Sequence, residues 1–316
     1  MPEQMNSNLP KSPLIRQGWL RVLLFCVFFL LVVLGIASIV GVIIVFMKKD
    51  EIQKGQAIDM KALMMGDFLW LNSLIGLAAS FLAVLLFRKI IDRKTMVSLG
   101  FQMNRFFRSS WSGLFLAPAI LGAGTLILYF SGHLQWTDIN FSASDLFIEL
   151  GIMAMVALGE EIVFRGYILN NLMESFNRWI ALGISAMLFA VVHMMNPNYD
   201  FIAMANIFLA GILLGLNYIY TRNLWFAILF HFSWNLFQGP LLGYSVSGIH
   251  LPVLLQTELN GDQLLTGGEF GFEGSVIDLA LTLITILVLS AVYARKFRAA
   301  EETQLFPKPF SDVLIR

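Results

Sequence analysis

The chain has 316 residues, of which 58% are hydrophobic and only 13% are charged, and its formal net charge is zero. Soluble globular domains average about 45–50% apolar and about 25% charged residues, so this composition excludes an ordinary soluble enzyme and equally a disordered chain. The 21 Lys and Arg against 21 Asp and Glu leave no basic surplus for nucleic acid, and the single cysteine, Cys26, excludes an internal disulfide. The sequence therefore predicts an integral membrane protein whose partners include membrane lipids and no nucleic acid.

Eight apolar runs approach or exceed the length of about 20 residues that a helix needs to cross a bilayer. They cover roughly residues 19–47, 68–91, 111–130, 145–175, 179–195, 201–221, 224–243 and 275–297. The apolar stretch of the first run is much longer than the about 7–15 residues of a signal peptide, so we expect it to be retained as an anchor. The predicted fold class is all-α, a polytopic membrane helical bundle of about eight transmembrane helices.

The distribution of Lys and Arg predicts the orientation of these helices, because cytoplasmic loops are enriched in both residues. With an even number of spans and the N-terminus inside, most basic residues fall on the cytoplasmic side. The exceptions are Arg165, within a helix, and the lysines of the external loop 48–67, which are Lys48, Lys49, Lys54 and Lys61. The external loop 244–274 carries acidic residues and neither Lys nor Arg. We therefore expect a multi-pass protein of a bacterial-type cell membrane, with both termini cytoplasmic.

The chain divides into an N-terminal membrane region, residues 1–110, and a core, residues 111–316. The N-terminal region comprises two spans and the basic cytoplasmic segment 88–110, which also carries Phe101, Phe106, Phe107 and Trp111. Basic and aromatic side chains together favour contact with an anionic lipid surface. The residues suited to catalysis all lie in the core, within 144–243.

The fourth apolar run contains three charged residues, Glu160, Glu161 and Arg165. Charge at mid-membrane costs about 2.5–3.5 kcal/mol per residue, so three unpaired charges would cost roughly 8–10 kcal/mol, comparable to the stability of a typical protein. On a helix, Glu161 and Arg165 lie on one face a turn apart and can pair. Glu160 is rotated by about 100° from Glu161, so it has no local counter-ion. A desolvated carboxylate of this kind is suited to general acid or base catalysis.

Two later runs add polar residues that suit the same chemistry. His193 lies near the end of the fifth run, and His231 and Asn235 lie on one face of the seventh. If these helices pack against the fourth, one cavity would hold the groups needed to activate a water molecule and to bind an oxyanion. Two structural alternatives stay open. Glu161 and Arg165 could form an ion pair with no further role, and the His and Asn side chains could simply join helices by hydrogen bonds.

The other polar residues near the membrane have simpler predicted roles. Glu149 and Glu174 lie near the ends of the fourth run, where solvent can reach them. Asp278, near the start of the last run, is predicted to lie at the interface or at a helix N-terminus. Asn206 is expected to hydrogen-bond within the bundle, and Gly211, four residues before a second glycine, is expected to allow close helix packing.

Three short motifs appear in order along the fourth, fifth and seventh runs. Residues 160–165 read E-E-x-x-x-R, residues 189–193 read F-x-x-x-H, and residues 231–235 read H-x-x-x-N. In this order, each on a separate membrane helix, the motifs resemble those of the CPBP family. That family includes CAAX prenyl proteases and bacteriocin-processing enzymes and is also called the Abi or Rce1-like family. The resemblance covers residues 144–243.

The resemblance implies an intramembrane endopeptidase that acts on membrane-associated, lipidated or leader-bearing substrates. In the family pattern, Glu160 and His193 activate the attacking water, and His231 and Asn235 donate hydrogen bonds to the tetrahedral oxyanion. The second glutamate and the arginine of the first motif orient these groups. The resemblance thus assigns catalytic or supporting roles to all six motif residues.

A metal ion is compatible with this resemblance, because the family is commonly described as one of metalloproteases. If the enzyme binds zinc, its candidate ligands are Glu160, Glu161, His193 and His231. Their spacing matches no standard zinc motif, and a glutamate-activated water explains the same residues without a metal. We therefore favour an enzyme that needs no cofactor.

Two other functions stay open at this point. A non-catalytic membrane factor, such as a bacteriocin-immunity or scaffold protein, could retain the fold, but it has no evident need for the complete set of polar residues. A proton-coupled transporter could use the buried carboxylates as a relay, although the chain shows no inverted repeat and no paired broken helices. A peptidase accounts for more of the motif residues than either alternative.

Overall fold

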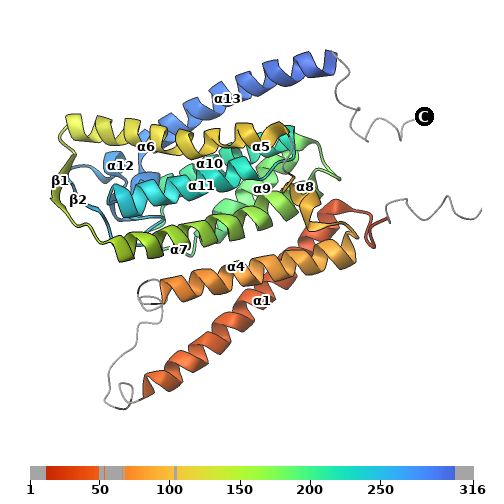
Figure 1. The fold of residues 1–316 in the computed structure, drawn as a ribbon, viewed down its shortest axis with the longest axis horizontal. Helices are drawn as coiled ribbons and strands as arrows, with labels where there is room; N and C mark the ends of the chain where they lie inside the picture. Colours follow the sequence, from red (N-terminus) through yellow and green to blue (C-terminus); the bar gives the residue numbers. More distant parts are fainter. Residues whose placement is uncertain (1–11, 50–52, 54–65, 67, 103–104, 303–316) are drawn as a thin grey trace, which may run out of the picture.

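The computed structural model describes residues 12–49, 53, 66, 68–102 and 105–302. Figure 1 shows a bundle of long helices. The longer ones are α1 (Gly18–Met47), α4 (Leu69–Leu86), α6 (Ser112–Phe130), α7 (Ala143–Glu161), α9 (Arg178–His193), α10 (Phe201–Thr221), α11 (Trp225–Leu236) and α13 (Val276–Glu302). The shorter α-helices are α5 (Arg105–Ser110), α8 (Asn170–Leu172) and α12 (Gln263–Thr266), and the strands are β1 (Leu134–Ile139) and β2 (Leu255–Leu259). Each predicted apolar run contains one long helix, so the all-α fold class is confirmed.

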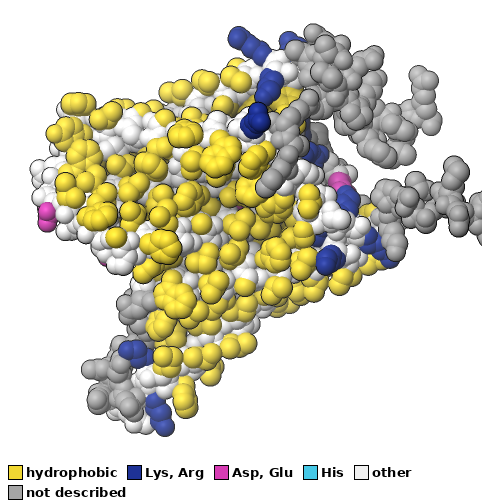
Figure 2. All heavy atoms as spheres, viewed as in Figure 1, with side chains coloured by type: hydrophobic (Ala, Val, Ile, Leu, Met, Phe, Trp, Pro, Cys, Tyr) yellow, Lys and Arg dark blue, Asp and Glu magenta, His cyan; other side chains and the backbone are white. Residues whose placement is uncertain are grey.

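Five helical segments are long and apolar enough to cross a membrane: 18–47, 69–91, 106–130, 201–221 and 276–298. The motif-bearing helices α7, α9 and α11 are not among them. α9 has 16 residues and α11 has 12, whereas α7 carries four acidic residues. Figure 2 shows hydrophobic side chains spread over the helices of one face, with Lys and Arg gathered near the ends. These features are those of an integral membrane protein, and the number of eight spans stays a prediction.

The loops alternate between two ends of the bundle (Figure 1). At one end β1 and β2 pair in antiparallel fashion, and Gly248 packs against the backbone of Pro197. At the other end Lys94 pairs with Glu174. Such alternation accompanies any number of consecutive crossings, even or odd. The orientation in the membrane stays a prediction, and the two termini and most of the loop 48–67 lie outside the described residues.

The helix that carries the three charged residues changes its geometry at that point. α7 ends at Glu161 and continues as the π-helix η3 (Ile162–Leu169), all of whose residues are buried. A π-turn holds an extra residue relative to an α-turn, and such turns occur frequently at functional sites. The sequence predicts one continuous helix over 145–175, and the apolar pattern carries no sign of this change. Similar π segments end α4, at η1 (Phe87–Ile91), and α11, at η4 (Phe237–Leu241).

A buried ionic network fastens α1 to the helices that follow it. Asp92 accepts hydrogen bonds from Arg21 Nη1 at 3.0 Å and from Arg88 Nη1 at 2.8 Å, and all three side chains are buried. Arg21 also pairs with Glu174, whose other carboxylate oxygen is 2.5 Å from Lys94 Nζ. The sequence predicts a solvated Glu174 with no particular partner. In the structure it is a half-buried link between segments that are far apart in the sequence.

The basic segment 88–110 packs on the bundle through most of its aromatic rings. The rings of Phe101 and Phe107 lie 5.9 and 5.7 Å from that of Trp225, measured between centroids. The ring of Phe106 stacks on the ring of Phe297 in α13. Of the four aromatic side chains predicted to meet lipid, Trp111 is exposed, at 46%. The three phenylalanines are only partly buried by these contacts, so the lipid contact of this segment stays a prediction.

Two acidic side chains are buried where the sequence predicts accessible ones. Glu149 and Asp278 are each only 3% exposed. Asp278 lies in the first turn of α13, and its carboxylate accepts a hydrogen bond from Thr282 Oγ1 at 3.0 Å. The prediction of a solvent-accessible Glu149 is wrong, whereas Asp278 lies at a helix N-terminus, one of its two predicted positions, although it is buried. The end of an apolar run shows where hydrophobic residues stop, but not which other segment packs over that position.

Candidate active site

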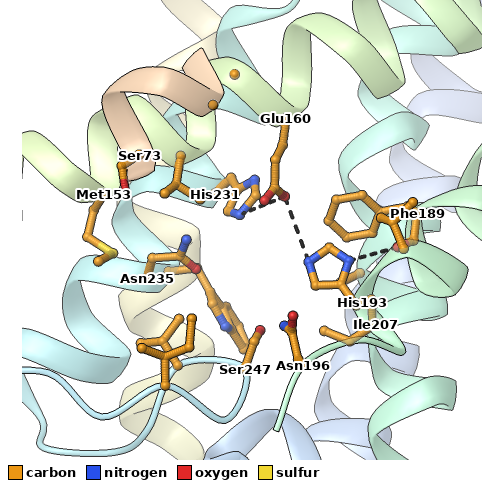
Figure 3. A pocket seen from close by; sticks show the side chains of 18 of the residues that line it. Ser73, Met153, Glu160, Phe189, His193, Asn196, Ile207, His231, Asn235 and Ser247 are labelled. Atoms are coloured by element: carbon orange, nitrogen blue, oxygen red, sulfur yellow. Dashed lines mark hydrogen bonds and ion pairs between the residues drawn. The ribbon is translucent and has the colours of Figure 1, made fainter. Parts of the chain in front are cut away.

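Three helices bring the motif residues to one cavity. α7 supplies Glu160 near its C-terminal end, α9 supplies His193 as its last residue, and α11 supplies His231 and Asn235 one turn apart. The cavity has a volume of about 380 Å³, and these four side chains form part of its wall. Figure 3 shows Glu160 pointing toward both imidazoles. The structure therefore brings together the fourth, fifth and seventh predicted runs.

The carboxylate of Glu160 lies between the two imidazoles without bonding directly to either. Its Oε2 atom is 3.8 Å from Nε2 of His193 and 3.9 Å from Nε2 of His231. Both distances exceed the range of about 2.7–3.2 Å for a hydrogen bond to nitrogen. This oxygen is buried and has no hydrogen-bond partner among the described residues. A water molecule about 2.8 Å from Oε2 and from one ring nitrogen would satisfy both groups.

The adjacent Glu161 has a different environment, as its position on the helix predicts. Its side chain is fully buried, and its Oε1 atom accepts hydrogen bonds from Arg165 Nη1 at 2.8 Å and from His231 Nδ1 at 2.9 Å. The predicted pairing of Glu161 with Arg165 is thus confirmed. Because Nδ1 of His231 is held by Glu161, its Nε2 atom faces Glu160 and the cavity. Of the two neighbouring glutamates, Glu161 therefore holds an imidazole and Glu160 faces the cavity.

Three groups contact the guanidinium of Arg165. Besides Glu161, it donates to the carbonyl oxygen of Gly211 at 3.2 Å, and its guanidinium lies 4.4 Å from the ring centroid of Phe189. A Cβ atom at Gly211 would lie 2.8 Å from the Cα atom of Ala186, so only glycine allows α10 to approach α9 this closely. The predicted close packing at Gly211 is confirmed, and it also presents a carbonyl to the buried arginine.

The backbone of α9 orients His193. Its Nδ1 atom lies 2.7 Å from the carbonyl oxygen of Phe189, one turn earlier on the same helix. A carbonyl can only accept, so Nδ1 carries the proton, and Nε2 of the neutral ring is an acceptor that faces Glu160. His193 is therefore held in the tautomer that can take a hydrogen bond from a water molecule beside the carboxylate.

Asn235 lies on the cavity wall next to His231 (Figure 3). It is 4% exposed, and its carboxamide makes no hydrogen bond to any other described residue. Buried amide groups are normally hydrogen-bonded, so an unpaired one on a cavity wall is available to a ligand. Its position one helical turn from His231 directs both side chains toward the same part of the cavity.

The structure adds groups that the motifs alone do not identify. The carbonyl of Phe189 orients His193, and a signal for this was present, because residues four apart on a helix are the ones whose backbone and side chain meet. Asn196 and Ser247 also line the cavity and lie across it from Glu160 in Figure 3. Both belong to loops, for which the apolar pattern predicts no position.

The predicted zinc ligands do not form a set of four in this geometry. Arg165 and Nδ1 of His231 both engage Oε1 of Glu161, whereas its Oε2 atom has no hydrogen-bond partner among the described residues. Among the described residues, no group of three or more His, Cys, Asp or Glu side chains is arranged to hold a metal ion. Metal dependence stays a prediction, and the roles below are derived for the side chains alone.

Comparison with protein families gives an independent result for this part of the chain. Residues 141–237 match the family model described as Rce1-like, type II CAAX prenyl endopeptidase Rce1-like. This segment is similar to the Rce1-like family. All three motifs, from Glu160 to Asn235, fall within it, and the Rce1-like family is a family of proteases. Together with the apolar helices, the match supports an intramembrane protease. Comparisons with curated proteins and with solved structures found no match.

Proposed function

We propose that the protein is an intramembrane endopeptidase in which Glu160 activates water for attack on a peptide carbonyl. The observation that supports this most strongly is the place of its carboxylate, on the cavity wall between two imidazole nitrogens 3.8 and 3.9 Å away. A structural ion pair explains Glu161 and Arg165, which neutralise one another in the adjacent core. It does not explain a neighbouring carboxylate that faces a cavity.

The proton transfers follow from the positions of Glu160 and His193. A water molecule hydrogen-bonded to Glu160 and to Nε2 of His193 gives its proton to the carboxylate as its oxygen bonds to the peptide carbon. The protonated Glu160 then returns this proton to the amide nitrogen when the C–N bond breaks. One water molecule is consumed, a carboxylic acid and an amine are formed, and Glu160 regains its charge.

The oxyanion of the tetrahedral intermediate would be bound from α11. Asn235 can donate through its free carboxamide, and His231 can donate through Nε2 when its ring is protonated. Glu161 supports that protonated state, because its carboxylate accepts the hydrogen bond from Nδ1 at 2.9 Å. Donors that are held in place before the reaction are usually the largest single contribution to stabilising such an intermediate.

Replacing Asn235 with Ala is expected to lower turnover by about 100- to 1000-fold, the usual effect of removing one oxyanion donor. The binding of substrate should change less, because the bond forms in the transition state. The measurement is kcat at equal amounts of folded protein, with Asn140→Ala, at an exposed position before α7, as the matched control. Full activity of the Asn235 variant would remove this residue from the oxyanion role.

Exhaustive chelation of divalent metal ions is expected to leave peptidase activity unchanged. The reason is the buried guanidinium of Arg165, which pairs with Glu161 at 2.8 Å and whose positive charge opposes a divalent cation beside that carboxylate. The measurement is turnover before and after treatment with EDTA and phenanthroline. Loss of activity that one particular divalent ion restores would overturn the metal-free mechanism.

The substrates are proposed to be membrane-associated, lipidated or leader-bearing proteins, because the motif-bearing helices pack against α4, α10 and α6, which are apolar enough to cross a membrane. The experiment that tests the function compares protein termini in membrane fractions from cells that make the native chain or the Glu160→Gln variant at matched levels. We expect a defined set of new termini that is present with the native chain and absent with the variant.

The same comparison separates the alternatives. Identical termini in both cells, with a cellular phenotype that persists in the variant, would favour a non-catalytic membrane factor. Proton uptake by vesicles that contain the purified protein, without any new termini, would favour a transporter. The termini themselves identify the bond that is cut.

A further inference from the structure

The cavity has a second polar end, formed by acidic residues outside the motifs. Glu273, in the 3₁₀ turn η6 (Phe272–Gly274), is 7% exposed, and Asp278 of α13 is 3% exposed, and both line the cavity. Ser275, two residues after Glu273, accepts a hydrogen bond from the backbone N–H of Asp278 at 3.0 Å, so the two acidic residues lie at the same end of the cavity. Ser247, which binds Glu273, lies across the cavity from the catalytic glutamate in Figure 3. No Lys or Arg is found among the described residues that line the cavity.

The carboxylate of Glu273 is held rigidly by neutral donors. Its Oε1 atom accepts from Trp234 Nε1 at 2.9 Å, and its Oε2 atom accepts from the N–H of Ser247 at 3.0 Å and from its hydroxyl at 2.7 Å. Hydrogen bonds of this kind stabilise a charged carboxylate without neutralising it. Glu273 therefore contributes a fixed negative charge, and both of its oxygen atoms are already occupied.

A buried amide oxygen at the same end of the cavity has no partner. Asn206 is 1% exposed, and its Nδ2 atom donates to the carbonyl oxygens of Glu273 and Ser275 at 2.6 and 2.8 Å. Because both partners are acceptors, the nitrogen must lie on that side, and Oδ1 is fixed as the free acceptor. This oxygen is buried without a hydrogen-bond partner among the described residues. An unpaired buried acceptor is costly unless a ligand supplies a donor.

We propose that this end of the cavity binds a Lys or Arg side chain of the substrate, beside the bond that is cut. The proposal rests on the peptidase function and defines its substrate class further. An ammonium or guanidinium group supplies the donor that Asn206 Oδ1 lacks and a positive charge beside the two carboxyl groups. The aromatic ring of Trp234, which also lines the cavity, adds a favourable surface for a cation.

An organic cation suits this site better than a metal ion. Calcium and magnesium bind carboxylate oxygens directly at about 2.0–2.6 Å, whereas those of Glu273 are occupied by three hydrogen bonds.

The distance between the bound basic side chain and the bond that is cut follows from the geometry of α11. Trp234 is three residues from His231, or about 4.5 Å along the helix axis, and an extended peptide spans about 3.3–3.6 Å per residue. The basic side chain should therefore lie within about two residues of the cut.

The test uses full-length protein in cells and maps the termini that depend on Glu160. We expect Lys or Arg to be enriched within two residues of these cuts, relative to the rest of the same proteins. Asp278→Asn and Glu273→Gln should each reduce cutting at the basic sites by about tenfold or more, because each removes one charge from a buried ion pair. Asp278→Glu should restore it, and Asp145→Asn, which removes an exposed acid from α7, should have no effect.

Each other outcome overturns the proposal in a recognisable way. An absence of Glu160-dependent termini would remove the peptidase function and this binding site with it. Glu160-dependent termini without enriched Lys or Arg would leave the peptidase intact and remove the site, even if a variant failed to fold. Stabilisation of the purified native protein against heat by millimolar Ca²⁺ or Mg²⁺, absent in Asp278→Asn, would identify a metal-ion site instead.

Discussion

Replacing Glu160 with Gln is expected to lower the rate of peptide hydrolysis by about 10²- to 10⁴-fold, the usual contribution of a general base. Gln has nearly the same size, but it cannot take the proton from water at the position between the two imidazoles. Because Glu160 has no ion pair with Arg165, thermal stability should stay close to that of the native chain. The measurement is turnover at a cut identified from cellular termini, together with thermal unfolding of the purified protein.

The matched control for this change is Glu258→Gln on strand β2. Glu258 is exposed and accepts a hydrogen bond from Gln135, so its replacement removes one carboxylate far from the cavity and should not alter turnover. Glu161→Gln should differ from both, since it leaves the guanidinium of Arg165 buried without a counter-ion and lowers stability. Native turnover in Glu160→Gln would show that another group activates the water.

Replacing Asp92 with Asn is expected to destabilise the protein by about 3–5 kcal/mol, the cost of leaving a buried charge without its partner. The effect is large because one carboxylate faces both Arg21 and Arg88, so its loss leaves an excess of buried positive charge. α1 should then separate from α4 before the rest of the bundle unfolds. Thermal unfolding measures the loss, and limited proteolysis near α1 locates it.

Lys94 provides the comparison within the same network. Its ammonium group is 37% exposed, and its partner Glu174 is 30% exposed, so Lys94→Gln should cost less than about 1 kcal/mol. A loss of stability of equal size in Asp92→Asn and Lys94→Gln would show that the network acts through its total charge. A negligible change in Asp92→Asn would mean that apolar contacts alone hold α1 in place.

The helices and the pairing of Glu161 with Arg165 could be predicted from the sequence, because both depend on local spacing. Apolar runs mark helices within a few residues, and side chains four apart meet on any helix. The meeting of His193 and His231 at Glu160 depends on how three helices pack. The sequence offered only the cost of unpaired membrane charge as a reason to expect it. The family match at 141–237 supports the same three motifs without testing the role of any one residue.

Burial at the ends of helices could not be predicted in the same way. Asp278 stands at the first turn of an apolar helix, a position that usually faces solvent, and it is buried in a helix against which both α10 and η6 pack. The β1–β2 pairing likewise joins two loops separated by more than a hundred residues. Long-range contacts of this kind carry no periodic signal, so the acidic end of the cavity became visible only in the structure.

The pairing of β1 with β2 brings the two ends of the motif-bearing stretch together. β1 precedes α7, and β2 follows α11. The intervening residues 140–254 therefore begin and end at neighbouring points of the β1–β2 pair. Segments whose ends are adjacent are the ones that tolerate insertion into another chain or a change in the order of their elements. The motif-bearing stretch therefore begins and ends at one place on the bundle, although α4 and α13 also contribute to the cavity wall.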